Sequence, residues 1–127
     1  MTLKLIHVDT FTDKPFRGNA AAVCILPGPR DTAWMQQVAQ EMNLSETAFL
    51  YRQPQGFHLR WFTPIVEIDL CGHGTLAAAH VLTEERYIQR EEEARFFTGS
   101  GVLTARHKGE WIELDFPAML EQRTTRP

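Results

Sequence analysis

The chain has little of what builds disulfide-stapled or membrane-spanning proteins. Its 127 residues include only two cysteines, Cys24 and Cys71, too few and too far apart for a disulfide framework. This cysteine usage predicts a reducing, cytoplasmic setting. No apolar run approaches the roughly 20 residues that cross a bilayer. The first residues include a histidine and an aspartate among the apolar ones, so they do not match a signal peptide.

Positive charge is also scarce. Thirteen Lys and Arg stand against 16 Asp and Glu, and the basic residues are scattered along the chain. Neither a nucleic acid nor a membrane is therefore expected as a partner. The apolar fraction of 43% is that of a folded chain. We expect one domain over residues 1–118 and a frayed tail over 119–127, where apolar periodicity is lost.

Hydrophobic periodicity predicts about seven strands and two helices. This content indicates an α+β fold, in which a mostly antiparallel sheet is rolled around a central apolar helix. Periodicity leaves the strand order open. The expected strands cover residues 3–11, 20–26, 46–52 and 56–63, with two or three more between 95 and 116.

The two predicted helices differ in their apolar surface. The first begins after Asp31, a suitable N-cap, and is amphipathic. Its apolar stripe consists of Trp34, Val38 and Met42, flanked by Met35 and Ala39. The second follows the sequence DLCGHGTLAAAH, and its residues 76–82 are apolar except for one histidine, so we expect it to be covered nearly all round.

The most reactive side chains gather where this apolar helix begins. Cys71, Gly72, His73 and Gly74 directly precede its run of small residues. The first N–H groups of a helix lack intrahelical partners and lie at the positive end of the dipole, so they can bind a carboxylate or an enolate oxygen. The same field would favour a thiolate at Cys71 and a neutral imidazole at His73. Alternatively, Cys71 is a small buried residue, His73 a capping side chain, and the glycines a tight turn.

A metal site is not expected at this helix. His73 and His80 are seven positions apart, which is roughly 10 Å along a helix that rises 1.5 Å per residue. One ion cannot be shared over that distance. The sequence therefore predicts no metal site at this helix.

Two further positions could carry chemistry. Glu46 stands between the amphipathic helix and an apolar strand, where it could carry a proton if the fold desolvates it. Alternatively, Glu46 is solvated in a surface turn that Ser45 caps. Gly18 and Asn19 could form a simple turn, or could aim an amide at a substrate.

Three segments carry a resemblance to a known family. They read FRGNAAAV, NLSETAFLY and RWFTPIVEIDLCGHGTLAAAHVL. In this order and at this spacing, they resemble the N-terminal half of the phenazine biosynthesis PhzF-like isomerases, from the first strand to about residue 116. The resemblance implies a diaminopimelate epimerase-like lobe, in which a sheet is rolled around a central helix. It also implies an active site in the cleft between two such lobes.

The same resemblance implies roles for individual residues. Glu46 would be the acid/base that moves a proton between carbons of a small carboxylated substrate. His73 would orient that substrate from the start of the helix. No cofactor would take part. The substrate-binding positions would be Asn19, Gly72, Gly74 and Thr75.

Some residues depart from the family pattern. Cys71 stands where the related epimerases carry one of two proton-transferring cysteines, but His73 replaces the asparagine typical there. This replacement favours the PhzF-like branch and leaves a Cys71-based epimerase or racemase as an alternative. Ala20 stands where the family usually has proline, so the loop beside Asn19 loses that rigidity.

The chain is about half as long as the resemblance implies. The second lobe, which supplies an aspartate to the cleft, has no counterpart here. Three arrangements remain open. Two copies could pair about a two-fold axis to complete the cleft, a separately encoded second lobe could join, or the chain could be a truncated half-domain that at most binds a carboxylate.

Overall fold

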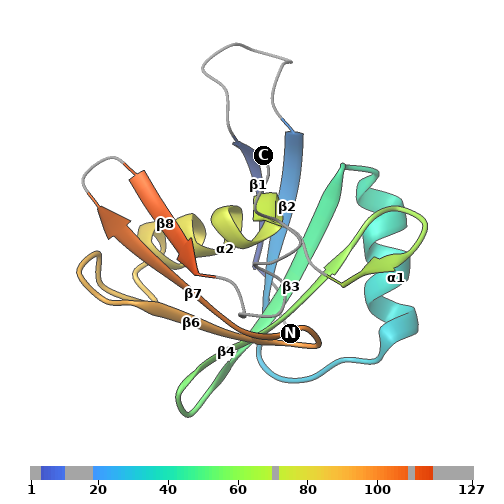
Figure 1. Cartoon of the computed structure of the whole chain (residues 1–127). Helices are drawn as coiled ribbons and strands as arrows, with labels where there is room; N and C mark the ends of the chain where they lie inside the picture. Colours follow the sequence, from blue (N-terminus) through green and yellow to red (C-terminus); the bar gives the residue numbers. More distant parts are fainter. Residues whose placement is uncertain (1–3, 11–18, 70–71, 109–110, 116–127) are drawn as a thin grey trace.

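The chain folds into one rolled β-sheet and two α-helices in a computed structural model that describes residues 4–10, 19–69, 72–108 and 111–115 (Figure 1). This confirms the expected α+β class. The helices are α1 (Thr32–Met42) and α2 (Gly72–Glu84). The strands are β1 (Lys4–Thr10), β2 (Asn19–Leu26), β3 (Glu46–Gln53), β4 (Gly56–Phe62), β5 (Glu67–Ile68), β6 (Ala94–Thr98), β7 (Gly101–Lys108) and β8 (Trp111–Asp115).

The strands form a single sheet in the order β1-β2-β3-β4-β6-β7-β8, and β5 pairs with β4 beside this path. Five of the seven described pairings are antiparallel, so the expected mostly antiparallel sheet is confirmed. The two parallel pairings, β2 with β3 and β4 with β6, are the ones joined through α1 and α2. A parallel pair needs such a crossover, because the chain must return to the end of the sheet where the first strand began before the second strand can start.

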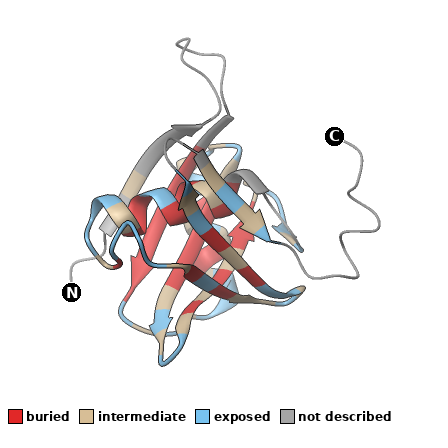
Figure 2. Ribbon diagram, turned by 60° about the vertical axis from the view of Figure 1, so that its left-hand side comes forward, coloured by how far each residue is buried: buried red, intermediate tan, exposed pale blue. Residues whose placement is uncertain are grey.

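Both faces of the sheet are buried over its middle strands, which Figure 2 shows in red. Successive side chains of a strand point to opposite faces. In β2, Val23 therefore joins the cluster that surrounds α2, whereas Cys24 joins the cluster beneath α1. In β3, Leu50 likewise joins the cluster around α2, and Phe49 joins the cluster beneath α1. A strand buried on both faces reads as a continuous apolar run, as the residues of β2 do.

Helix α2 lies inside the roll and is buried on nearly every side (Figure 1). Its residues Ala77–Ala79, Val81 and Leu82 are all buried, and His80 is exposed between them. This confirms the expectation of near-complete cover. Three consecutive alanines keep the helix narrow, so that the surrounding strands can pack closely on it.

Helix α1 covers the outer face of the sheet and confirms the predicted cap. The Asp31 carboxylate accepts a hydrogen bond of 2.8 Å from the Trp34 N–H. The predicted apolar face packs on the sheet, with its flanking residues buried most deeply. Met35 and Ala39 are the buried residues of this helix, whereas Trp34 and Val38 are only partly buried. The helix packs on Phe49 and Phe62.

Some expectations concern residues outside the described part of the chain. Lys108 of β7 lies opposite Trp111 of β8, and the connection at 109–110 lies outside the described residues. The domain boundary at residue 118 and the tail at 119–127 fall outside as well, and both stay predictions. No helix in the described ranges is long and apolar enough to cross a membrane.

We predict that Gly56→Ala destabilises the fold. Gly56 opens β4, and a Cβ atom there would press on the backbone carbonyl oxygen of Arg95 and lie 3.0 Å from the Phe97 side chain. Such overpacking typically costs about 1–3 kcal/mol. Urea denaturation should show a loss of this size in the free energy of unfolding. Gly28→Ala is the matched control, because nothing lies within 4 Å of its Cβ position. Equal losses in the two variants would contradict the close approach of β4 and β6.

Candidate functional site

Helix α2 begins at the end of the sheet where β3 starts. Glu46 is the first residue of β3, and Ala48, two positions on, pairs with Trp61 of β4. Trp61 pairs in turn with Ile68 of β5, which precedes the start of α2 by four residues. The register therefore places the first turn of α2 near Glu46.

The far end of α2 confirms this direction. Arg52 lies near the end of β3, and its Nη2 donates a hydrogen bond of 3.0 Å to the carbonyl oxygen of Tyr87, just beyond the helix. Helix α2 thus runs alongside β3, with its N-terminus toward Glu46 and its C-terminus toward Arg52. The positive end of the helix dipole therefore lies toward the beginning of β3, where Glu46 stands.

Glu46 has one buried carboxylate oxygen. Alternation along β3 places its side chain on the face that carries Ala48 and Leu50, which is the face toward α2. The residue as a whole is partly exposed, yet Oε1 is buried and accepts no hydrogen bond within the described residues. Glu46 therefore begins a strand and is not fully solvated in a turn. Its catalytic role stays a prediction.

The other predicted positions gather at the same end. Asn19 opens β2 and pairs with Thr10, and Ala21, two positions on, pairs with Glu46. Gly72 is the first residue of α2, and Thr75 in its first turn is fully buried. Gly18 and Cys71 lie outside the described residues, as does the side chain of His73. At backbone level, the fold thus brings together the starts of β2, β3 and α2.

Residues that the sequence did not single out complete this end. Phe62 pairs with Thr47, so one step further along the register Thr63 lies opposite Glu46. The Thr63 hydroxyl accepts hydrogen bonds from the Ile65 and Val66 N–H groups at 3.2 and 3.1 Å and closes the turn after β4. A Thr-Pro pair at the end of a strand signals such a turn.

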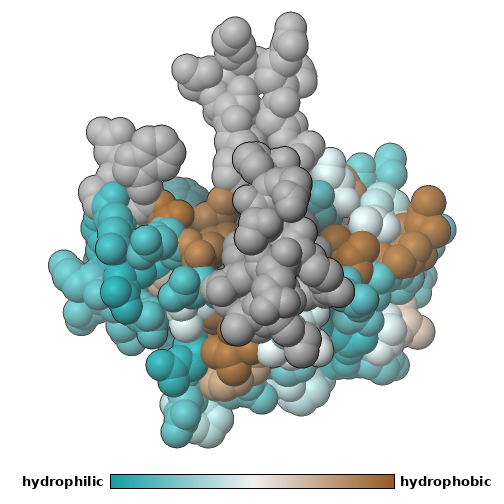
Figure 3. Space-filling view, viewed as in Figure 1, coloured by the Kyte–Doolittle hydropathy of each residue, from teal (hydrophilic) through white to brown (hydrophobic). Residues whose placement is uncertain are grey.

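The hairpin between β6 and β7 also reaches this end. Its Ser100 hydroxyl donates a hydrogen bond of 2.8 Å to the Asp69 carbonyl oxygen, just before α2. Two exposed apolar sites flank this end. Ile65 and Val66 are 84% and 48% exposed, and Val102 is 46% exposed. Figure 3 shows hydrophobic surface over the turn that contains Ile65 and Val66.

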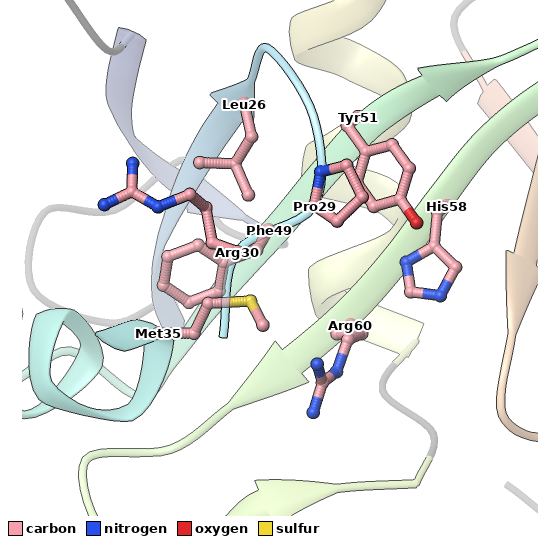
Figure 4. A pocket seen from close by; sticks show the side chains of 8 residues that line it. All are labelled: Leu26, Pro29, Arg30, Met35, Phe49, Tyr51, His58 and Arg60. Carbon is pink, nitrogen blue, oxygen red and sulfur yellow. The ribbon is translucent and has the colours of Figure 1, made fainter. Parts of the chain in front are cut away.

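A separate hollow of about 290 Å³, including its open mouth, lies on the outer face beside α1 (Figure 4). The Tyr51 and His58 rings stack there with centroids 4.9 Å apart. The Arg60 guanidinium is already engaged in two hydrogen bonds of 2.7 and 2.8 Å to Glu67. Because this hollow opens on the face opposite to Glu46, it is not part of the candidate site. It is lined by Leu26, Pro29, Arg30, Met35, Phe49, Tyr51, His58 and Arg60.

Cys24, the described cysteine, is unsuited to nucleophilic chemistry. Burial raises the pKa of its thiol to about 11, and the nearby Arg30 charge only partly offsets this rise. A thiol with so high a pKa forms almost no thiolate at neutral pH, and the thiolate is the reactive form. Within the described ranges, no group of three or more His, Cys, Asp or Glu could hold a metal ion.

Comparisons with known proteins agree on one family. Residues 8–126 match the PhzC-PhzF family, described as phenazine biosynthesis-like protein. An uncharacterized isomerase of Halalkalibacterium halodurans is 59% identical over 118 residues, which cover 93% of this chain and 44% of that protein. The phenazine biosynthesis-like domain-containing protein of Homo sapiens is 45% identical over 125 residues, covering 92% of this chain and 43% of that protein.

Solved structures agree with the fold. A PhzC/PhzF protein from Clostridium difficile superposes with a TM-score of 0.83 at 43% identity, over 91% of this chain and 44% of that one. A hydroxyproline epimerase from Agrobacterium vitis was solved with bound trans-4-hydroxy-L-proline. It superposes with a TM-score of 0.65 at 12% identity, over 88% of this chain and 40% of that one. The second match shows the fold alone. The chain spans about 44% of the length of the first of these relatives.

We predict that stability falls as the pH drops below about 6.5. Burial, followed by the Arg60 charge, lowers the pKa of His58 below 6.5, and Glu67 offsets part of this effect. The unfolded chain therefore takes up a proton at His58 before the folded chain does, so acidification favours unfolding until the pH passes the folded pKa. Above about 6.5, His58 contributes no pH dependence. Urea midpoints between pH 7.5 and 5.5 should fall more steeply in the wild type than in His58→Gln. Parallel curves would contradict the lowered pKa.

Proposed function

The chain belongs to the phenazine biosynthesis-like PhzC-PhzF family, whose members are PhzF-like isomerases and epimerases, and on that premise we propose that it is an isomerase lobe. Glu46 is its acid/base, and it moves a proton on a small carboxylated substrate that binds at the start of α2. The observation that carries this proposal is the placement of a half-buried carboxylate at the end of the sheet where a buried helix begins.

The burial of Glu46 suits it to proton transfer. Oε1 is enclosed, while the residue as a whole keeps some exposure, so the carboxyl group can meet a bound substrate and still be shielded from bulk water. A general base needs both hydrogen-bond reach and partial desolvation. Cys24 offers no competing base, because its raised pKa keeps the thiol protonated.

The start of α2 suits a carboxylate. The helix opens with Gly72, and its first turn carries no acidic side chain that would offset the positive end of the dipole. Backbone N–H groups at a helix start can hold an anion and can stabilise an enolate as it forms. Gly72 and Gly74 leave room for a ligand to approach the backbone. His73, Thr75 and Asn19 belong to the same proposal as substrate-orienting positions.

The reaction balances without an oxidant or a cofactor. Glu46 takes a proton from one carbon of the substrate, and the electron pair of that C–H bond delocalises toward an adjacent carbonyl or double bond. The protonated Glu46 then returns the proton to another carbon. The negative charge that forms between these steps is stabilised by the N–H groups at the start of α2.

A second protein surface beside the start of α2 would shield the candidate site from solvent. The chain spans less than half of its first relatives, and Ile65 and Val66 remain exposed beside the candidate site. Contiguous apolar residues at a surface can mark an interaction site. We propose that a second copy of the chain packs there about a two-fold axis and forms the facing wall of the site. A separately encoded lobe is the competing outcome.

We predict that Glu46→Gln slows proton exchange by about 10²–10⁴-fold, because general acid–base catalysis contributes that much. The measurement is deuterium incorporation from D₂O into a panel of small cyclic and amino-acid carboxylates, followed by NMR. Glu41→Gln, an exposed change on α1, is the matched control and should leave the rate intact.

A rate that survives Glu46→Gln but is lost in Cys71→Ala would overturn the proposal in favour of a cysteine-based epimerase. If no carboxylate in the panel exchanges at any protein concentration, the chain is a non-catalytic half-domain.

We predict that the chain dimerises through the surface that contains Ile65 and Val66. Light scattering after size exclusion should give twice the monomer mass at high concentration, and Ile65→Asp should shift the protein to a monomer because it places a charge in the apolar contact. Gln55→Asp, at the opposite end of the sheet, is the control. A monomer at all concentrations would rule out the second copy.

A further inference from the structure

Two buried polar atoms near the candidate site have no hydrogen-bond partner among the described residues. One is Glu46 Oε1, and the other is the indole Nε1 of Trp61. Trp61 is 1% exposed, so bulk water does not reach its N–H group. Buried polar atoms are nearly always hydrogen-bonded, because an unpaired one carries its full desolvation cost. Each of these two atoms therefore requires an explanation.

The register brings the two side chains to the same face of the sheet. Ala48 pairs directly with Trp61, and both belong to the core cluster that surrounds α2. Glu46 lies two positions before Ala48, on the same face of β3. Glu46 and Trp61 are thus diagonal cross-strand neighbours, whose Cβ atoms are typically about 7–8 Å apart, within reach of long and aromatic side chains. Thr47 Oγ1 is also unpaired, but it points to the opposite face.

The choice of tryptophan at this position is informative. Phe62 on the same strand and Phe49 and Phe96 on the neighbouring strands are equally buried, so the core readily uses an aromatic side chain that has no polar atom. The indole adds an N–H donor that must find an acceptor, and a tryptophan whose donor stays unsatisfied is a costly way to fill space. The Nε1 atom therefore has a use that phenylalanine could not supply.

The chemistry of the two atoms limits what they can share. Trp61 Nε1 only donates, and an ionised Glu46 only accepts. A single group that satisfies both must accept from the indole and donate to the carboxylate. A carboxylate cannot do this, whereas a water molecule can, and buried waters typically bind two to four such protein atoms.

We infer that an ordered water is held between Trp61 Nε1 and Glu46 Oε1, and that Trp61 is a positioning residue for Glu46. The inference deepens the proposed function, on which it rests. The water fixes Oε1 and so sets the orientation of the carboxyl group toward the start of α2. Trp61 acts through this water and does not touch the substrate.

The test is a water contact measured by NMR on the ¹⁵N-labelled protein. The three tryptophans give three indole signals, and Trp61→Phe assigns the one that disappears. Magnetisation transfer from water should reach the Trp61 indole proton with the long contact time of a bound water. Glu46→Ala should abolish this contact. Glu41→Ala on α1 is the matched control and should preserve it.

Two results would overturn the inference. One is a Trp61 indole proton that shows no contact with a bound water in the wild type. The other is a contact that persists unchanged in Glu46→Ala. If Glu46→Ala fails to fold, Glu46→Gln replaces it, and the Trp61 signal must then shift more than the Trp34 signal for the inference to stand. Because the readout is not turnover, loss of the proposed activity and loss of the water contact can be told apart.

Discussion

A helix that a sheet surrounds on almost every side can meet a ligand only at its ends, and this constraint organises the whole molecule. Helix α2 is buried along Ala77–Ala79, Val81 and Leu82. Its C-terminal end is occupied by the chain itself, where the Tyr87 and Ile88 N–H groups bind the Leu82 carbonyl oxygen at 2.8 and 3.3 Å. The N-terminal end is the one at which we propose that a substrate binds. The parallel pairing of β2 with β3 places Glu46 at that end.

The sequence predicted the parts of this arrangement that depend on local pattern. The strand over residues 56–63 and the capping by Asp31 both follow from neighbouring residues, and both are present. The strand order was not predictable, because the two parallel pairings join strands that are separated by whole helices. The two-residue strand β5 is too short to show periodicity, yet its pairing with β4 is what shows where α2 begins.

The candidate site likewise combines features that the sequence predicts with features that only the folded sheet reveals. A helix start with glycines and a carboxylate before a strand can both be read from the chain, but their proximity depends on register, which is a property of the folded sheet. The unpaired indole nitrogen of Trp61 could not be foreseen either. In the sequence, Trp61 is one more apolar position of β4, and its N–H becomes notable only once the surrounding side chains are known to leave it unpaired.

The central claim is that the start of α2 and the start of β3 form one binding site for a carboxylate. It is tested most directly by titrating the ¹⁵N-labelled protein with a small cyclic carboxylate such as cyclohexanecarboxylate, with the neutral cyclohexanecarboxamide as the reference. The account predicts that the backbone amide signals of residues 72–75 and of Glu46 shift together along one saturable curve, and only with the anion. Shifts at the helix start that leave Glu46 unmoved, or equal shifts with the neutral amide, would contradict it.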